Sequence, residues 1–265
     1  MSPSLATYVY ALLRSQAAPA TGGAPAGLPG LSAPRALDAG GGLWLVAADA
    51  PLPDYGADEI GRRLEDLSWV STCALAHERM VEHFGAAATL VPMKLFTLFA
   101  GDARAVEHIG GERGRLARLL DRIEGCREWG VRVLFDEAAA RAALDAEGNG
   151  GEGGGPSGGA GTAFLQQKKR QRQAARTLAA RAGAAAEELF AALAARARDA
   201  VRRDPPAAEV AARLLLDAAF LVPEEAAAAF EEEVGRGAEA LRRLGGDVTL
   251  TGPWPAYNFA AEEEG

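Results

Sequence analysis

One tract of fifteen residues, 147–161, holds nine glycines and a proline. Glycine loses more backbone freedom on folding than any other residue, so this composition predicts a flexible connector. The whole chain has 265 residues, which is about the length of two domains. We therefore predict an N-terminal domain at 1–146, a glycine-rich linker at 147–161 and a C-terminal domain at 162–265.

Apolar periodicity on both sides of the tract predicts an α+β fold, with a small mixed sheet and helices in each domain. The expected strands are 7–13, 43–48, 89–99, 128–136, 211–222 and 247–251. The expected helices are 58–69, a second helix that follows it and reaches Phe84, 102–124, 162–203, and a last helix that begins at Pro223. Asp102 is the expected N-cap of the third of these. Four prolines and repeated glycines predict that 16–42 is a loop.

Charge argues against a polyanion-binding protein. The net charge is −8, although 162–203 carries ten basic and three acidic residues and contains a basic run at 168–172. Residues 223–265 carry ten acidic and three basic residues, so the two excesses cancel. The basic run also lacks the interleaved aromatic residues that stack on bases. We expect no nucleic-acid partner, with a nucleic-acid-binding helix after Gly161 as a lesser alternative.

The residues that could carry catalysis or hold a metal are few. Cys73 and His77 are four residues apart on an expected helix and could approach each other, either as a thiolate–imidazole pair or as ordinary core residues. The cysteines, Cys73 and Cys126, predict neither a disulfide framework nor a zinc site and suit the cytoplasm. We expect no catalytic residues, no metal, no cofactor, no signal peptide and no membrane-spanning segment.

Three segments together resemble one family. They are Val-Pro-Met-Lys-Leu-Phe-Thr-Leu-Phe at 91–99, Glu-Trp-Gly-Val-Arg-Val at 128–133, and Leu-Thr-Gly-Pro-Trp-Pro-Ala-Tyr-Asn-Phe at 250–259. In this order and combination the chain resembles the gas vesicle GvpF/GvpL family. The family-motif residues, which are also the candidate partner-binding residues, are Pro92, Met93, Lys94, Phe96, Glu128, Trp129, Gly252, Pro253, Trp254, Pro255 and Tyr257.

The resemblance implies a non-catalytic accessory or minor structural protein of gas vesicle assembly, and hence a role in buoyancy. It implies a cytoplasmic protein associated with the vesicle, whose C-terminal domain is ferredoxin-like. The implied partner is the main shell protein GvpA, with other accessory proteins as further candidates, and no lipid membrane. It leaves open the GvpF or GvpL subfamily and the oligomeric state. The alternative is a ferredoxin-like small-molecule enzyme or sensor with Cys73, His77 or His108 in a pocket.

Two motif segments allow sharper expectations. The alternation in 91–99 predicts one strand with apolar groups on both faces, which is either a central buried strand that binds nothing or a strand with one face open to a partner. Pro92 favours the second alternative, a sheet edge or end where another chain adds. Lys94 would then need a buried partner such as Glu128. The prolines around Trp254 predict a rigid clasp that buries this tryptophan, with a docking role second.

Overall fold

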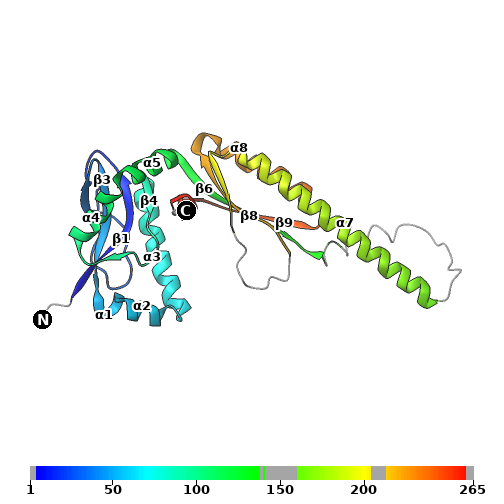
Figure 1. Cartoon of the computed structure of the whole chain (residues 1–265), viewed down its shortest axis with the longest axis horizontal. Helices are drawn as coiled ribbons and strands as arrows, with labels where there is room; N and C mark the ends of the chain where they lie inside the picture. Colours follow the sequence, from blue (N-terminus) through cyan, green and yellow to red (C-terminus); the bar gives the residue numbers. More distant parts are fainter. Residues whose placement is uncertain (1–3, 138–139, 141–159, 204–212, 261–265) are drawn as a thin grey trace. The chain divides into compact units, whose positions relative to one another are not determined.

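The computed structural model describes residues 4–137, 140, 160–203 and 213–260, with the side chains of 160–168 and 170–172 left out. The chain divides into two compact units (Figure 1). The first unit consists of Met1–Arg127 and Trp254–Gly265, and the second of Glu128–Pro253.

This division differs from the predicted one. Strand β6 (Cys126–Phe135) begins at the end of the first unit and continues into the second sheet, so the division falls at Arg127 and not in the glycine tract. Most of that tract lies outside the described residues, and helix α7 already begins at Ala160. The C-terminal segment returns to the first unit because its apolar residues pack there.

The first unit contains a five-stranded sheet. Its strands are β1 (Leu5–Arg14), β2 (Arg35–Gly40), β3 (Leu43–Pro51), β4 (Thr89–Pro92) and β5 (Leu98–Phe99). Their order is β2-β3-β1-β4, with β5 also paired to β1, and all these pairs are antiparallel. The predicted mixed sheet is therefore wrong here, since β1 receives each neighbour in the opposite direction. The predicted loop 16–42 ends early, because β2 forms a hairpin with β3.

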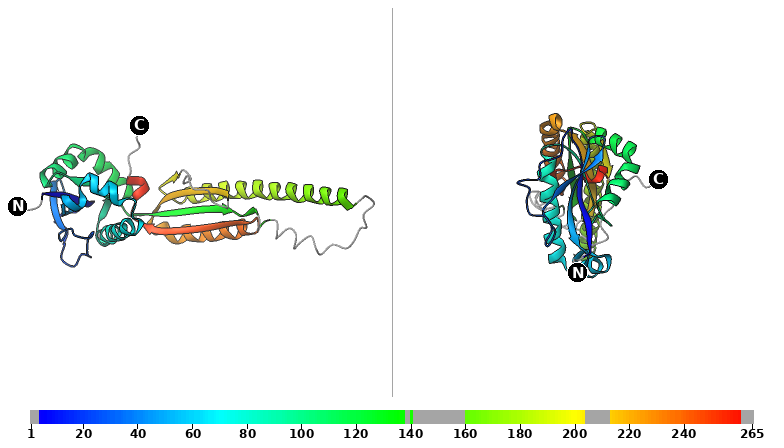
Figure 2. Two further views of the ribbon diagram at one scale, coloured as in Figure 1. Left: turned by 90° about the horizontal axis from the view of Figure 1, so that it is seen from below. Right: turned by 90° about the vertical axis from the view of Figure 1, so that its left-hand side faces the viewer.

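Helices cover both faces of this sheet. They are α1 (Leu52–Tyr55), α2 (Ala57–Arg63), α3 (Leu67–Gly85), α4 (Asp102–Gly111) and α5 (Arg113–Ile123). Figure 2 shows α3 on one side of the sheet and α4 with α5 on the other. The single helix predicted at 102–124 is thus two helices, and Gly101 rather than Asp102 is the residue that precedes the first turn.

A helix cap and a β-bulge determine where α3 begins and which side chains of β1 face it. The Asp66 carboxylate accepts hydrogen bonds from the backbone N–H groups of Ser68 and Trp69, at 3.0 and 3.1 Å, and so caps α3. A register shift between Val9 and Ala11 adds one residue to β1 opposite β3. The face of β1 against α3 consequently carries Tyr8, Tyr10, Ala11 and Leu13, all buried.

The second unit has the order strand, helix, strand, strand, helix, strand. After β6 come α7 (Ala160–Ala194), β7 (Asp199–Arg202), β8 (Arg213–Pro223), the 3₁₀ turn η1 (Glu224–Ala226), α8 (Ala227–Arg242) and β9 (Gly246–Trp254). The sheet order is β7-β8-β6-β9. The helix predicted at 162–203 is too long, because the chain turns after Ala194 and Val201 lies in β7, paired with Ala219.

Both long helices of the second unit lie on one face of its sheet (Figures 1 and 2). The core between them is apolar and includes Phe220, Val222, Phe230 and Leu241. The predicted apolar side of α8, with Phe230, Val234 and Leu241, is confirmed as buried. None of the helices in the described part of the chain is long and apolar enough to cross a membrane.

Candidate functional site

The segment predicted as one strand at 89–99 is two short strands joined by a turn. Strand β4 ends at Pro92, β5 begins at Leu98, and Phe96 between them has a φ of 65°. A left-handed residue interrupts a strand, so the alternation argument for one two-faced strand is wrong. Lys94 lies exposed in this turn, where burial imposes no need for an ion-pair partner.

A hydrogen-bond network from the sheet and α3 holds the turn. The Met93 carbonyl can only accept, so His77 Nε2 carries the proton and donates to it at 3.0 Å. His77 Nδ1 therefore accepts from the Tyr8 hydroxyl at 2.7 Å. The Tyr8 oxygen in turn accepts the backbone N–H of Phe96 at 3.3 Å. The Phe96 ring stacks on Trp69 with centroids 5.2 Å apart, which completes the support of this strained residue.

His77 is a structural residue in this arrangement. It is 4% exposed, and burial lowers its pKa from 6.5 to about 4. Both ring nitrogens already have partners, so the expected approach of Cys73 and His77 does not give a thiolate–imidazole pair. Burial also raises the pKa of the Cys73 thiol, which disfavours a reactive thiolate.

The C-terminal segment packs against the same region. The Tyr257 hydroxyl donates to Glu78 Oε2 at 2.6 Å, joining residues 179 positions apart. Pro255, Ala256 and Phe259 are buried. Trp254 is 40% exposed, so the expectation of a buried tryptophan is wrong and the buried anchors are the smaller residues that follow it.

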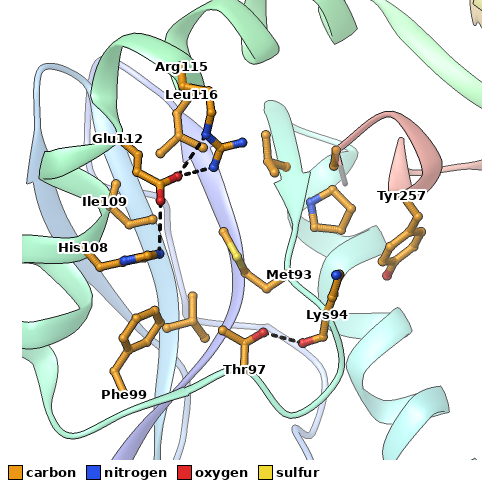
Figure 3. Close-up of a pocket in the computed structure, with 14 residues that line it drawn as sticks. Met93, Lys94, Thr97, Phe99, His108, Ile109, Glu112, Arg115, Leu116 and Tyr257 are labelled. Atoms are coloured by element: carbon orange, nitrogen blue, oxygen red, sulfur yellow. Dashed lines mark hydrogen bonds and ion pairs between the residues drawn. The ribbon is translucent and has the colours of Figure 1, made fainter. Parts of the chain in front are cut away.

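A pocket of about 280 Å³ brings the two motif segments together (Figure 3). Pro92, Met93 and Lys94 line it from β4 and the turn, and Tyr257 lines it from α9 (Tyr257–Ala260). Its remaining apolar lining comes from Val9, Val91, Phe99, Ile109, Leu116 and Ala260. The pocket can therefore take an apolar side chain beside the Lys94 ammonium, which has no ion-pair partner among the described residues.

Sequence reasoning missed most of the polar rim of this pocket. Glu112 lies 3.7 Å from His108 Nε2 and accepts from Arg115 Nε at 3.0 Å. The hydrogen bond from Arg115 lowers the pKa of Glu112. Figure 3 shows these three side chains on the opposite side of Met93 from Lys94 and Tyr257. Their spacing along α4 and α5 was the available signal, since residues three and four apart share a helix face.

A second, apolar pocket of about 610 Å³ lies on the first unit beside the same turn. Phe96 and Leu98 line it together with α1, α2 and the start of β1. Its lining includes Leu5, Leu52 and Leu64, which are 50%, 41% and 51% exposed. The turn thus contributes Lys94 and Thr97 to the first pocket and Phe96 to this apolar one.

The remaining motif residues line neither pocket. Glu128, Trp129, Gly252 and Pro253 belong to the second unit, and Trp254 and Pro255 line neither cavity. Trp129 packs near Phe230, and its buried Nε1 has no partner among the described residues. In the part of the chain that the structure describes, no group of three or more His, Cys, Asp or Glu side chains could hold a metal ion.

Comparison with known proteins identifies the family. The model of the gas vesicle synthesis protein GvpL/GvpF family matches residues 6–261. The chain belongs to this family. The match covers nearly the whole chain, so it includes both units and all three motif segments.

Individual relatives agree with this assignment. The chain is 31% identical over 142 residues to gas vesicle protein L of Streptomyces sp. strain CB03234, which covers 53% of this chain and 52% of that protein. The chain therefore spans about half the length of the curated relative it matches. The crystal structure of GvpF from Anabaena sp. PCC7120 has a TM-score of 0.68 at 18% identity, covering 98% of both chains. GvpF from Microcystis aeruginosa has a TM-score of 0.63 at 16% identity, covering 97% of this chain and 99% of that one. These two structures share the mixed α and β fold of this chain.

Proposed function

We propose that this gas vesicle family protein is a non-catalytic assembly factor that binds the shell protein GvpA and supports its delivery or nucleation. A shell subunit must expose a large apolar face before it assembles, and an unshielded face of that kind aggregates. A protein that covers the face until assembly prevents this loss. Other accessory proteins of the vesicle are further candidate partners, and we expect the protein in the cytoplasm, in association with the vesicle.

The apolar pocket on the first unit carries the proposal. Isolated exposed leucines are ordinary on a protein surface, but Leu5, Leu52 and Leu64 surround one concave site. Tyr55 and Phe96 add aromatic rings to its lining. Such a concave apolar surface matches an aliphatic segment of a shell subunit better than it matches a polar substrate.

The second unit is proposed to be ferredoxin-like. If β6, β7, β8 and β9 are numbered one to four, their order in the sheet is 2-3-1-4. Along the chain, the strands and helices follow in the order βαββαβ. That combination is the pattern of the ferredoxin-like fold. The fold by itself carries no function, so the assembly role is argued from the first unit and the family.

Co-purification of GvpA with the full chain tests the proposed function. Leu52→Glu and Leu64→Glu place a charge at the apolar pocket and are expected to abolish capture of GvpA while leaving the melting temperature nearly unchanged. Leu75→Glu is the matched control, because Leu75 is 59% exposed and lies outside the pocket.

Full capture of GvpA by the Leu52 and Leu64 variants would contradict the proposed surface. Loss of capture by the Leu75 variant as well would show that any added charge, and not this pocket, controls binding. Blotting of purified vesicles would then show whether the protein remains associated with the finished shell.

A further inference from the structure

The sheet of the second unit has one face without a helix in the described part of the chain. Helices α7 and α8 lie together on the other face (Figure 2). Successive side chains of a strand point to opposite faces, so alternate residues of each strand point away from the core beneath these helices. On β8, Phe220 and Val222 belong to the helix-covered core and Asp217 to the opposite face. Arg132 of β6, Arg203 after β7 and Thr251 of β9 share this helix-free face with Asp217.

A buried carboxylate holds two arginines on this face. Arg132 donates from Nε and Nη2 to Asp217 Oδ2 at 3.0 and 2.7 Å. Arg203 donates from Nε to Asp217 Oδ1 at 2.7 Å and also forms an ion pair through Nη2. The Arg203 backbone N–H donates to the Asp217 carbonyl at 2.8 Å, so the main chain fixes the second arginine as well.

The two arginines have more N–H donors than Asp217 can accept. A guanidinium has five N–H donors. Each arginine directs two of them to Asp217, which leaves three on each without an acceptor among the described residues. The Asp217 side chain is 3% exposed, whereas those of Arg132 and Arg203 are 47% and 31% exposed. Arg132, Arg203 and Asp217 by themselves carry one net positive charge, and the two arginines present a set of oriented donors to solvent; alternation along β6 places the buried Glu128 on the same face.

Small neighbours keep the arginines accessible. A Cβ on Gly130 would lie 2.6 Å from Thr251 Oγ1 and 3.3 Å from Arg203 Nη2, so only glycine leaves room for this placement. Beside the arginines, Val201 of β7 is 38% exposed on the same face. A ligand that approaches this face meets fixed arginines next to a small apolar surface.

We propose that Arg132 and Arg203 form a binding site for the carboxylate groups of an acidic segment of a partner protein. Arginine pairs with carboxylates through two parallel N–H bonds, and prior immobilisation by Asp217 lowers the entropic cost of binding. Protein carboxylates fit better than nucleic acid, because the described residues of this face offer no aromatic ring for base stacking. The chain as a whole carries a charge of −8, so any attraction for an acidic ligand is local to such a site.

The test measures fluorescence anisotropy of a labelled oligoglutamate peptide on the full-length protein at low ionic strength. We expect saturable binding that weakens with added salt. Arg132→Gln or Arg203→Gln is expected to weaken binding about tenfold, since a hydrogen bond to a charged group contributes on that order. Arg203→Lys retains the charge but not the fork of donors, and is expected to bind less tightly than the wild type.

Arg202→Gln is the matched control. Arg202 neighbours Arg203 but lies on the helix-covered side, where it pairs with Glu187 and stacks 4.1 Å above Phe190. This variant is expected to bind oligoglutamate like the wild type. Hydrogen exchange of β8 establishes that the Arg132 and Arg203 variants remain folded.

Three results would overturn the proposal. The first is a wild-type protein that does not bind oligoglutamate. The second is binding by folded Arg132 and Arg203 variants that is as tight as that of the wild type, which would mean that Asp217 and its arginines are only structural. The third is stronger competition by inorganic phosphate than by free glutamate, which would make phosphate rather than carboxylate the ligand. None of these outcomes depends on whether GvpA binds the first unit.

Discussion

The two sheets of this chain differ in how many of their faces helices cover. In the first unit α3 lies on one face and α4 with α5 on the other, and the buried polar groups of Tyr8 and His77 bond to one another. In the second unit the helices lie on one face, and the core beneath them is almost wholly apolar. The core of the first unit thus includes polar groups that must be satisfied internally, whereas the core beneath the helices of the second unit depends on apolar packing. A change in either core should act on its own unit.

The largest effect is expected from Phe230→Ala in the second unit. Phe230 is fully buried and lies between Phe220 and Trp129, at centroid distances of 5.4 and 6.1 Å. Truncating a buried phenylalanine costs about 3–5 kcal/mol, because both the transfer energy and the packing are lost. Hydrogen exchange should show β8 losing protection while β3 in the first unit retains it. Equal loss in both strands would mean that the two units unfold together.

How much of this comparison the sequence could predict depends on the residues involved. Strands β1 and β3 follow from short continuous runs of apolar residues, and the apolar side of α8 follows from apolar residues that repeat at helix spacing. The end of α7 does not follow, because the alanine-rich sequence after Ala194 has no breaker before Pro205. Periodicity also missed the turn in 93–97, because Phe96 continues the apolar alternation while adopting a left-handed conformation.

The candidate site was less predictable than the fold. The motif resemblance drew attention to Pro92, Met93, Lys94 and Tyr257, and the structure places all four at one pocket. No local sequence pattern predicts the contact between Tyr257 and Glu78, because 179 positions separate them. Glu128 and Trp129 were grouped with these residues by motif alone and belong to the other unit.

The second prediction concerns pH and separates the two units. The pKa of His77 is about 4 in the folded protein and 6.5 ordinarily, so the unfolded chain binds more protons between these values. The stability of the first unit should therefore fall by up to about 3 kcal/mol as the pH drops from 6.5 to about 4. All three histidines precede residue 128, so this contribution is absent from the second unit.

His77→Gln tests this assignment, because glutamine offers both a donor and an acceptor but does not titrate. Denaturant unfolding of the wild type and the variant near neutral pH and near pH 4.5 gives the free energy of unfolding of each protein at both pH values. The difference between the two proteins in how this free energy changes with pH is the contribution of His77. Burial raises the pKa of Glu78 and gives a slope of opposite sign, which both proteins share and which cancels in the difference. An unchanged pH dependence in the variant would remove His77 as its source.

The smallest effect is expected from Trp254→Ala. The prolines on both sides of Trp254 suggest a buried anchor, yet this side chain is 40% exposed whereas Phe259 is 3% exposed. Because Trp254 is only partly buried, we expect Trp254→Ala to lower the free energy of unfolding by about 1–2 kcal/mol, against about 3–5 kcal/mol for Phe259→Ala. Thermal or denaturant unfolding of the two variants gives the ranking directly. A larger loss of stability for Trp254→Ala than for Phe259→Ala would make the tryptophan, and not the buried residues that follow it, the anchor of the C-terminal segment.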